Sequence, residues 1–468
     1  MIENKKTKIV ATIGPNSSSV IMLEKLMKAG MNVARINMSH GTKESLTNSV
    51  TNIRQASKNV GKEVAILLDL SGPKIRTGEY TSETINIVKG KKIILTSEKI
   101  IGDEKRIYIN YPLLPQEVSP GSTIMLDDGK KELEVEKVEG NDIFCKIIVG
   151  GELKPRRGVN VPGAYLSVSS ITTKDKKDLQ MGLEVGVDMI ALSFVRSPKD
   201  VIELKNLLKK AKKVLPVISK IETQEAIDNL DEILEVTDGI MVARGDLAIE
   251  VPTEMVPIYQ KEIISKCNDL GKPVITATQM LESMIHSPVP TRAEVSDIAN
   301  AIFDGTDAIM LSEESALGEY PIEAISVMTR IALTTEEEMN AMEDYDTEEI
   351  PNVISDAVVS VADSLKAKYI VALTESGSTA RLVARFTQNH VVLALTSHLQ
   401  TVRNLSLSSS IVPIQISAIS NLDEAIKRVP EMLKEMKLAK KGDVIVVTAG
   451  VPFKKPGSTN MLFVVHID

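Results

Sequence analysis

Short apolar runs recur along the first 314 residues and alternate with segments that have the spacing of amphipathic helices. Helical spacing is clearest at residues 19–29, 175–185 and 198–212. The strand-like runs are TKIVATIG (7–14), MNVARINMS (31–39), EVAILLDL (63–70), DMIALSF (188–194), VLPVISKIE (214–222), DGIMVARGD (238–246), PVITATQM (273–280) and DAIMLSEE (307–314). Eight such runs with helices between them predict an α/β fold of the (β/α)8, or TIM-barrel, type.

Polar residues collect where these predicted strands end. In a (β/α)8 barrel the chemistry lies at the C-terminal ends of the strands, so this concentration marks the candidate site. The residues are Asn37, Ser39, His40, Asp69, Ser193, Lys220, Glu222, Arg244, Asp246, Thr278, Gln279, Ser312 and Glu314.

The regular alternation is interrupted between the third and fourth strands. Residues 77–158 are rich in Val, Ile and Lys, with turn signals at VSPGS and LDDGKKE. A connection of this length is too long for a loop and predicts an inserted all-β domain. The barrel would then consist of residues 1–76 and 159–336. At the catalytic face such an insertion is well placed to act as a lid.

The acidic run TTEEEMNAMEDYDTEEIP (334–351) marks a further boundary. Beyond it, the segments beginning at 369, 391 and 442 resemble parallel strands with helices between them, so residues 350–468 are predicted to form a separate α/β domain. The stretch TESGSTA (374–380) would present backbone amides at a helix N-terminus, which suits a phosphate group. An ordinary Ser/Thr helix cap explains the same residues equally well.

Composition narrows the function classes. The formal net charge of −8 argues against a general nucleic-acid binder. Cys145 and Cys267 are far apart and have no metal-binding or redox spacing. No apolar leader begins the chain and no run reaches membrane-spanning length, so we expect a soluble cytoplasmic protein without membrane contact.

Three side chains suggest the chemistry directly. Glu222 and Asp246 end adjacent predicted strands, so their carboxylates could converge on one hard divalent cation, Mg²⁺ or Mn²⁺. Lys220 lies two residues before Glu222 and therefore on the same strand face. Such a lysine can neutralise a transferring phosphoryl group or an enolate oxygen. A structural salt bridge inside the barrel is the alternative.

The remaining candidates are weaker individually. Thr278 and Ser312 could relay protons or simply bond local backbone. Arg35 and Arg76 suit phosphate contacts, although an isolated arginine is more often a surface residue. His40 fits a nucleotide contact no better than a local turn.

Ordered motifs then identify a resemblance. The chain contains ARINMSHG, GPKIRTG, RRGVNVPG, ISKIE, MVARGDLAIEVP, TATQMLESMI, PTRAEVSDIANAIFDGTDAIMLSEESALGEYP and PGSTN. Together, from VATIGP to PGSTNMLFVVHI, they resemble pyruvate kinase over essentially the whole chain. The resemblance implies a TIM barrel, an inserted β lid, a C-terminal α/β domain and a homotetramer.

The resemblance also implies phosphoryl transfer from phosphoenolpyruvate to ADP, giving pyruvate and ATP at the last step of glycolysis. Glu222 and Asp246 match the divalent-metal ligands, and Lys220 matches the lysine that stabilises the phosphoryl group and the enolate. SEESALG departs from the family's more usual SGETAKG near Ser312. The other matches are Arg35, Arg244, Gly245, Asp246 and Thr278 for the substrate, Asn37, His40, Arg76 and Arg157 for the nucleotide, and Thr278, Arg76 and Ser312 for catalysis.

The stretch LLDLSGPKIRTG (67–78) departs from most relatives. They hold a monovalent cation at residues that match Asn37, Ser39, Asp69 and the carbonyl of Leu70, and carry a glutamate at the position of Lys74. A lysine ammonium supplies the missing charge and repels K⁺ at close range, so we expect an enzyme that does not need K⁺. The alternative is a Lys74 that points into solvent.

The C-terminal domain is expected to bind a phosphorylated allosteric effector. The residues expected to hold it are Thr374, Ser376, Gly377, Ser378, Thr379, Lys454 and Lys455. Two other functions stay open: a metal-dependent lyase or aldolase that handles a pyruvate enolate, and a catalytically silent sensor of a phosphorylated metabolite. A lyase or aldolase would not need the lid, and a silent sensor would not need the intact set of reactive residues.

Overall fold

The computed structural model describes residues 5–39, 41–339, 349–387, 389–452 and 459–468. Eight parallel strands close into a barrel in the order β1-β16-β15-β14-β13-β12-β3-β2, which confirms the predicted TIM barrel. The strands are β1 (Lys8–Thr12), β2 (Val33–Asn37), β3 (Ala65–Leu70), β12 (Met189–Leu192), β13 (Val217–Ile221), β14 (Gly239–Ala243), β15 (Val274–Ala277) and β16 (Ala308–Leu311).

Each barrel strand is buried on both faces, which explains its nearly unbroken apolar sequence. Alternate residues point into the barrel, where Val10, Leu67 and Met241 belong to one closed cluster. Their neighbours Ile9 and Leu68 point outward and pack in a larger cluster beneath the helices. A pattern of alternating polar residues would have exposed one of these two faces.

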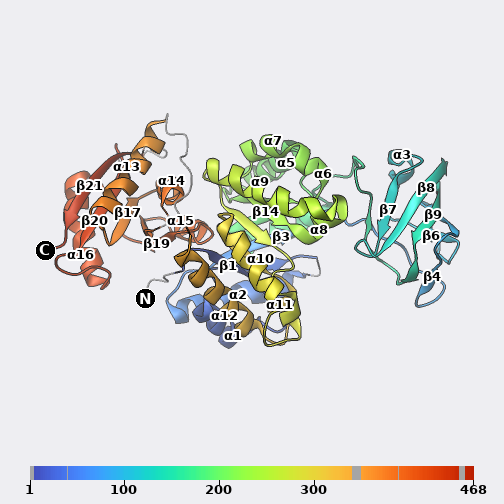
Figure 1. Cartoon of the computed structure of the whole chain (residues 1–468), viewed down its shortest axis with the longest axis horizontal. Helices are drawn as coiled ribbons and strands as arrows, with labels where there is room; N and C mark the ends of the chain where they lie inside the picture. The colour runs from blue at the N-terminus through green and yellow to red at the C-terminus, as the bar shows by residue number, and fades with distance from the viewer. Residues whose placement is uncertain (1–4, 40, 340–348, 388, 453–458) are drawn as a thin grey trace.

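Helices cover the outside of the barrel (Figure 1). Local signals set their ends: Ser19 caps α1 by accepting a hydrogen bond from the backbone of Met22, and Thr172 forms a capping box at α4. The helices are α1 (Val20–Ala29), α2 (Lys43–Val60), α4 (Thr173–Val185), α5 (Pro198–Lys210), α6 (Gln224–Asp228), α7 (Leu230–Val236), α8 (Arg244–Glu250), α9 (Val256–Asp269), α10 (Arg292–Phe303), α11 (Glu313–Ala316) and α12 (Pro321–Glu337), with short 3-10 turns η1 (Thr253–Met255) and η2 (Glu282–Ile285).

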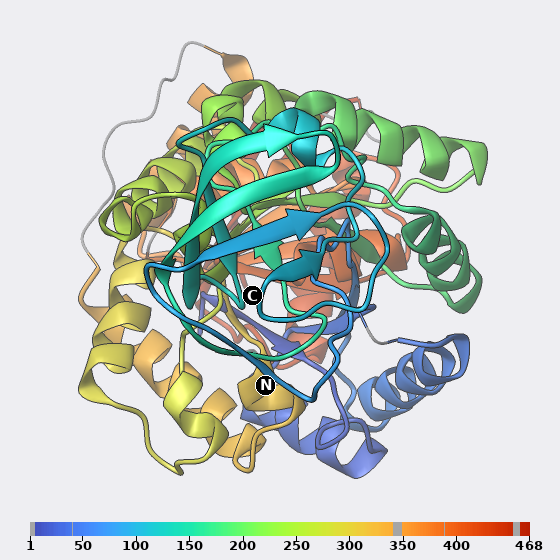
Figure 2. The same cartoon turned by 90° about the vertical axis from the view of Figure 1, so that its right-hand side faces the viewer.

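The long connection after β3 forms a body of strands beside the barrel (Figure 1), and Figure 2 views the molecule with these strands in front. It holds a six-stranded sheet in the order β11-β7-β8-β9-β5-β6 and a pair β10-β4 around its own apolar core. The predicted all-β insertion is confirmed, apart from the short α3 (Leu114–Glu117). Its strands are β4 (Ile85–Ile87), β5 (Lys92–Thr96), β6 (Arg106–Tyr108), β7 (Thr123–Leu126), β8 (Lys131–Glu139), β9 (Asp142–Val149), β10 (Gly151–Leu153) and β11 (Val159–Asn160).

The C-terminal part forms a separate sheet in the order β19-β18-β17-β20-β21, with helices packed against it. The three predicted strands are present, but β19 and β21 were not predicted. Both are edge strands with partly exposed side chains, and each contains a short apolar run, IVPI (411–414) and MLFVV (461–465), that could have indicated a strand. The elements are α13 (Ile350–Ser364), β17 (Tyr369–Leu373), α14 (Ser378–Phe386), β18 (Val392–Thr396), α15 (Leu399–Leu405), β19 (Ile411–Gln415), α16 (Leu422–Glu435), β20 (Val444–Gly450) and β21 (Thr459–His466).

The C-terminal domain docks on the N-terminal end of the barrel. The ammonium of Lys8, in β1, donates to the carbonyl of Ile411 at 2.8 Å, and the backbone amide of Ser409 donates to Asp307 at 2.7 Å. Arg403 of α15 pairs with Glu63 at 3.0 Å. This docking leaves the C-terminal ends of the strands to the inserted sheet. The exact domain limits stay predictions, and residues 340–348 lie outside the described chain.

Among the described residues, no helix has both the length and the apolarity needed to cross a bilayer.

Candidate functional site

Lys220 is the centre of the candidate site. It lies in β13 with its side chain 11% exposed, and its ammonium is 2.8 Å from Glu222 Oε1, 2.8 Å from Ser193 Oγ and 3.6 Å from Asp69 Oδ1. Burial alone would lower the pKa of Lys220, but the charges of Asp69 and Glu222 outweigh it and raise the pKa above its ordinary value. The site therefore holds a permanent positive charge with little access to water.

Arg35 adds a second buried cation, carried by β2, which is separated from β13 by β12 and β3. Its Nε and Nη2 bond Asp69 Oδ2 at 2.7 and 2.6 Å, and Nη1 donates to Thr12 Oγ1 at 2.9 Å. Burial would raise the pKa of Asp69, but the positive charges of Lys220 and Arg35 reverse this and hold the pKa below its ordinary value. Asp69 therefore stays ionised and fixes both cations.

Ser193 joins these groups, and the sequence analysis assigned it no role. Its hydroxyl donates to the carbonyl of Leu70 at 2.7 Å and accepts from Lys220. Its position at the end of a predicted strand was the only signal in the sequence. Thr12, which holds Arg35, is the last residue of β1 and so has the same kind of strand-end position, but it was not among the candidates.

Glu222 and Asp246 are the candidate metal ligands. Glu222 is 1% exposed, and its Oε2 accepts a hydrogen bond from the backbone of Phe194 at 2.6 Å. Asp246 lies in the first turn of α8 and lines a cleft between the barrel and the insertion. Loss of hydration there, followed by the charge of Glu222, raises the pKa of Asp246 to about 6. Because the charge of Glu222 disfavours ionisation of Asp246, a cation bound between the two carboxylates would stabilise the ionised form of Asp246.

The donor set fits a hard divalent ion. Within the described ranges, no three His, Cys, Asp or Glu side chains gather around one point, so the protein offers two carboxylates. Mg²⁺ commonly binds one or two carboxylates and completes its octahedron with water and substrate phosphates. Glu222 and Asp246 match that pattern, whereas a closed protein cage would need further ligands.

Arg244, Gly245 and Thr278 form one unit at the ends of β14 and β15. The Arg244 guanidinium points away from the cleft, toward Asp297 at 2.7 Å and the carbonyl of Thr278 at 2.8 Å. The Gly245 amide donates to Thr278 Oγ1 at 2.8 Å. Thr278 has a φ of 67°, a costly conformation for a β-branched residue. The side chain of Arg244 therefore positions the backbone of α8.

Ser312 lies at the end of β16, beside Thr278 on the neighbouring strand. Its amide donates to Glu314 Oε2 at 2.7 Å, and Glu314 also accepts from the amide of Leu281 at 3.2 Å. Glu314 thus fastens the SEESALG segment to the loop after β15. The Ser312 hydroxyl makes no hydrogen bond within the described part of the chain.

Lys74 reaches the residues of the candidate monovalent-cation position. Its Nζ donates to Ser39 Oγ at 2.8 Å, and the Asn37 side chain accepts from the Ser39 amide at 3.0 Å. Burial, followed by the charges of Arg76 and Lys220, lowers the pKa of Lys74. The side chain is partly open to solvent, but its ammonium is bonded toward the site.

A cleft of about 310 Å³ opens between the barrel mouth and the inserted sheet. Lys74, Arg76 and Asp246 line it from the barrel side, and Asp128 and Arg157 line it from the insertion. The guanidinium of Arg157 lies 3.4 Å from Asp127. The cleft therefore brings Asp246 together with Arg76 and Arg157, whereas Glu222 and Asn37 are not among its lining residues and His40 lies outside the described residues.

The candidate effector segment lies between β17 and α14. The amide of Gly377 donates to Thr374 Oγ1 at 2.9 Å, and Gly377 has a φ of 90°. Within the described part of the chain no side chain caps α14, and Thr379 bonds Thr459 at 2.8 Å. Ser376 is exposed and Ser378 begins the helix. Lys454 and Lys455 lie outside the described residues.

Comparisons with known proteins agree along the length of the chain. The family description "Pyruvate kinase, barrel domain" matches residues 4–325, and "Pyruvate kinase, alpha/beta domain" matches residues 352–465. A pyruvate kinase of Thermotoga maritima is 45% identical over 99% of this chain and 100% of its own length. One from Geobacillus stearothermophilus is 46% identical over 98% of this chain and 80% of its own.

A solved structure supports the same relationship. A pyruvate kinase from Cryptosporidium parvum superposes with a TM-score of 0.92 at 35% identity, covering 99% of this chain and 96% of that one. Fold, strand-end residues and full-length similarity lead to one conclusion: the chain belongs to the pyruvate kinase family.

Proposed function

We propose that this protein transfers the phosphoryl group of phosphoenolpyruvate to ADP and releases pyruvate and ATP. The observation that carries the proposal is the buried Lys220 ammonium, held by Asp69, Ser193 and Glu222 beside Asp246. Phosphoryl transfer needs mainly positioning and charge neutralisation, and a fixed, largely buried cation supplies both.

The phosphate end of the substrate would lie among cations. Lys220 would contact a phosphoryl oxygen throughout the transfer and the enolate oxygen after it. Arg76 would approach the phosphate from the rim of the cleft that it lines. Arg35 would act indirectly, by holding Asp69 in place, because its guanidinium is bound to that carboxylate. The substrate carboxylate would lie against the start of α8, at Gly245 and Asp246, next to Thr278.

Glu222 and Asp246 would hold Mg²⁺ or Mn²⁺ in this site. When bound, the ion would supply charge neutralisation to the phosphate oxygens. Loss of the phosphoryl group leaves an enolate, and a proton delivered to its carbon gives pyruvate. Thr278 and Ser312 lie at the ends of adjacent strands, and their hydroxyls are our candidates for the groups through which that proton passes.

ADP would occupy the cleft between the barrel and the insertion. Arg157, from the insertion, and Asn37 and His40, from the barrel, would contact it there. Closure of the insertion as a lid would exclude water and limit hydrolysis of the phosphoryl donor.

The protein would act without K⁺. The hydrogen bond from Lys74 to Ser39 supports this proposal, because it brings an ammonium to one of the residues of the cation position. Asn37, Asp69 and the carbonyl of Leu70 would complete that position. An ammonium there supplies the charge that K⁺ would bring.

Family membership also supports three broader proposals. The protein would be a homotetramer in the cytoplasm. A phosphorylated effector would bind at the N-terminus of α14, held by Thr374, Ser376, Gly377, Ser378 and Thr379, with Lys454 or Lys455 supplying charge.

The test is a coupled assay of pyruvate formation from phosphoenolpyruvate, with and without ADP and with and without Mg²⁺. We expect pyruvate and ATP in equal amounts, only when both are present. Pyruvate formation without ADP would instead identify a lyase or phosphatase, and no turnover with substrate binding retained would identify a sensor.

A further inference from the structure

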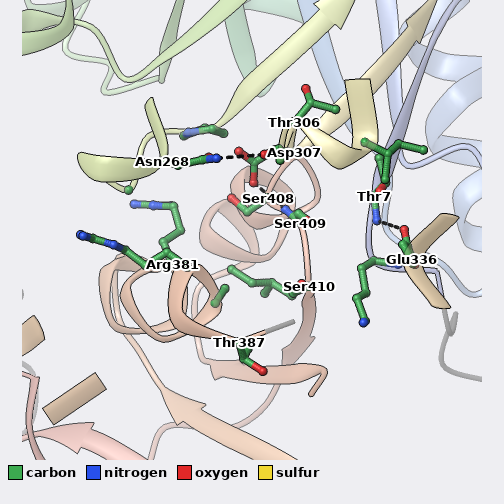
Figure 3. A pocket seen from close by; sticks show the side chains of 18 of the residues that line it. Thr7, Asn268, Thr306, Asp307, Glu336, Arg381, Thr387, Ser408, Ser409 and Ser410 are labelled. Atoms are coloured by element: carbon green, nitrogen blue, oxygen red, sulfur yellow. Dashed lines mark hydrogen bonds between the residues drawn. The ribbon is translucent and has the colours of Figure 1, made fainter. Parts of the chain in front are cut away.

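A second cavity, of about 90 Å³, lies at the opposite end of the barrel, where the C-terminal domain docks (Figure 3). Residues that precede β1, β15 and β16 line it from the barrel side, together with the end of α12. Helix α14 and residues 408–411 line it from the C-terminal domain. Because Lys220, Glu222 and Asp246 lie at the other ends of the strands, this cavity is separate from the site described above.

Ser408 is the first sign that the cavity takes a ligand. Its side chain lines the cavity and the residue is only 2% exposed. Yet its Oγ has no hydrogen-bond partner among the described residues. A buried hydroxyl normally finds a partner, because leaving it unbonded is costly. A molecule in the cavity would supply that partner.

The charges around the cavity favour an anion. Four cationic side chains line it, Lys6, Lys272, Arg381 and Arg385, against two acidic ones, Asp307 and Glu336. Both acids are already engaged by backbone amides. Those of Lys6 and Thr7 donate to Glu336 at 2.8 and 2.7 Å, and those of Val274 and Ser409 donate to Asp307 at 3.0 and 2.7 Å. Positive side chains therefore outnumber negative ones around this cavity, although the formal net charge of the whole chain is −8.

Arg381 is the cationic side chain best placed to pair with a bound anion. It lies in α14 and is partly buried, and its guanidinium has no hydrogen bond or ion pair within the described ranges. Lys272, by contrast, is occupied by the carbonyls of Leu234 and Thr237. Burial lowers the pKa of Arg381, with the carboxylates of Asp307 and Asp238 acting in the opposite direction. A bound anion would favour its charged form.

We propose that this cavity binds a small oxyanion, with Arg381 as its ion-pair partner and Ser408 as a hydrogen-bond donor. Inorganic phosphate and the phosphate end of a metabolite ester share the required chemistry, a tetrahedral dianion that accepts several hydrogen bonds. The cavity volume of about 90 Å³ would accommodate several water molecules and so has room for one such group. Because its two walls belong to different domains, the ligand braces the barrel against the C-terminal domain.

The experiment must separate this cavity from the N-terminus of α14. One guanidinium nitrogen of Arg381 lies 3.0 Å from where a Cβ on Gly377 would stand, so the two positions are neighbours. We therefore compare Arg381→Gln and Ser408→Ala with Ser378→Ala, which alters the helix N-terminus alone. The matched controls are Arg428→Gln on α16 and Ser355→Ala, a buried serine whose hydroxyl already bonds Pro351 at 2.7 Å.

The measurement is the melting temperature of the full chain against sodium phosphate, with chloride keeping the ionic strength constant. We expect a rise of about 2 °C near saturation in the unchanged protein. Most of that rise should be lost in Arg381→Gln and Ser408→Ala and kept in the other three variants. Ser408→Ala should fold as well as the parent without phosphate, because it removes a hydroxyl that has no partner.

Glycerol phosphate, titrated in parallel, distinguishes the two possible ligands, inorganic phosphate and a phosphate ester. A larger shift than with inorganic phosphate identifies an ester, and an equal or smaller one identifies the free ion. An equal phosphate response in the parent, Arg381→Gln and Ser408→Ala would overturn the proposal. A response lost only in Ser378→Ala would overturn it as well, because the anion would then bind at the helix N-terminus.

Discussion

At the scale of single residues, the candidate site depends on charges that hold one another in place. Asp69 bonds Arg35 on one oxygen and faces Lys220 with the other. Lys220 also pairs with Glu222, which is fixed from behind by the amide of Phe194. Each side chain is therefore positioned before any substrate arrives, so little reorganisation is needed during the reaction.

Replacing Lys220 by methionine tests this charge directly. Lys220→Met should lower kcat by roughly a thousandfold or more, because it removes a cation that is needed most in the transition state. Lys205→Met, which removes an exposed lysine paired with Asp238, is the control. The measurements are steady-state kcat and the circular dichroism spectrum. Near-normal turnover in a folded Lys220→Met protein would refute the assigned role.

The charge of Lys74 makes a second residue-scale prediction. With ionic strength held constant by a tetraalkylammonium salt, the unchanged protein should respond little to KCl. Lys74→Glu should lose roughly tenfold or more in activity, because it replaces the ammonium near Ser39 with a negative charge. KCl should restore part of that loss. Strong K⁺ activation of the unchanged protein would contradict the proposal.

At the scale of elements, the ends of β13 and β14 decide where the two candidate metal ligands lie. The parallel pairing of these strands aligns Ile221 with Val242, so the residues that follow them meet at one edge. Glu222 comes directly after β13, while Asp246 is carried by the first turn of α8, which begins where β14 ends. A strand end and a helix start together form the site.

Removing either carboxylate should weaken metal binding. Glu222→Gln and Asp246→Asn should each raise the dissociation constant for Mn²⁺ by at least about tenfold, because each loses an anionic oxygen ligand. Electron paramagnetic resonance of free Mn²⁺ measures this without turnover. Glu225→Gln, in the same cleft, is the matched control. Unchanged Mn²⁺ titrations in both variants would rule out the site.

The junction of β16 with residues 406–410 makes a prediction about pH. Burial raises the pKa of Asp307 to about 6, although amides of Ser409 and Val274 and the charges of Arg381 and Lys8 act the other way. The folded chain therefore binds this proton more tightly than the unfolded chain. The stability that it contributes is fully present below about pH 4 and is lost as pH rises through about 6.

We therefore expect Asp307→Asn to flatten the pH dependence of stability. Between pH 5 and pH 7 the unchanged protein should lose on the order of 1 kcal/mol through this group, and the variant should not. Melting temperatures across that range measure the difference. Parallel curves for the two proteins would show that Asp307 does not titrate there.

At the scale of the whole molecule, the barrel lies between the inserted sheet and the C-terminal domain. The inserted sheet shares the cleft of the candidate active site with the barrel. The C-terminal domain docks at the other end through polar contacts, among them Arg403 with Glu63 and Lys8 with Ile411.

Weakening this docking should separate the unfolding of the two bodies. Arg403→Ala removes contacts to Glu63 at 3.0 Å and to Asp188 at 3.4 Å, at a cost of about 1–3 kcal/mol. Calorimetry should then show an earlier transition for the C-terminal domain. Lys368→Ala, which breaks the pair with Asp443 inside that domain, serves as the control. A single transition at the unchanged temperature would contradict the expectation.

The sequence by itself determined the barrel, the insertion and the central strands of the C-terminal sheet, because a strand buried on both faces needs a continuous apolar run. It also placed Lys220 and Glu222 at the end of one predicted strand and Asp246 at the end of the next. The spacing of residues along a single strand can be read from the local sequence. The edge strands β19 and β21 were missed, although the apolar runs IVPI (411–414) and MLFVV (461–465) could have indicated them. Only the tertiary structure decided the contacts among distant segments: Ser193 between Leu70 and Lys220, Thr12 behind Arg35, Lys74 on Ser39, and the cavity around Ser408. Such contacts depend on the closure of the barrel and the docking of its neighbours, which no short stretch of sequence encodes.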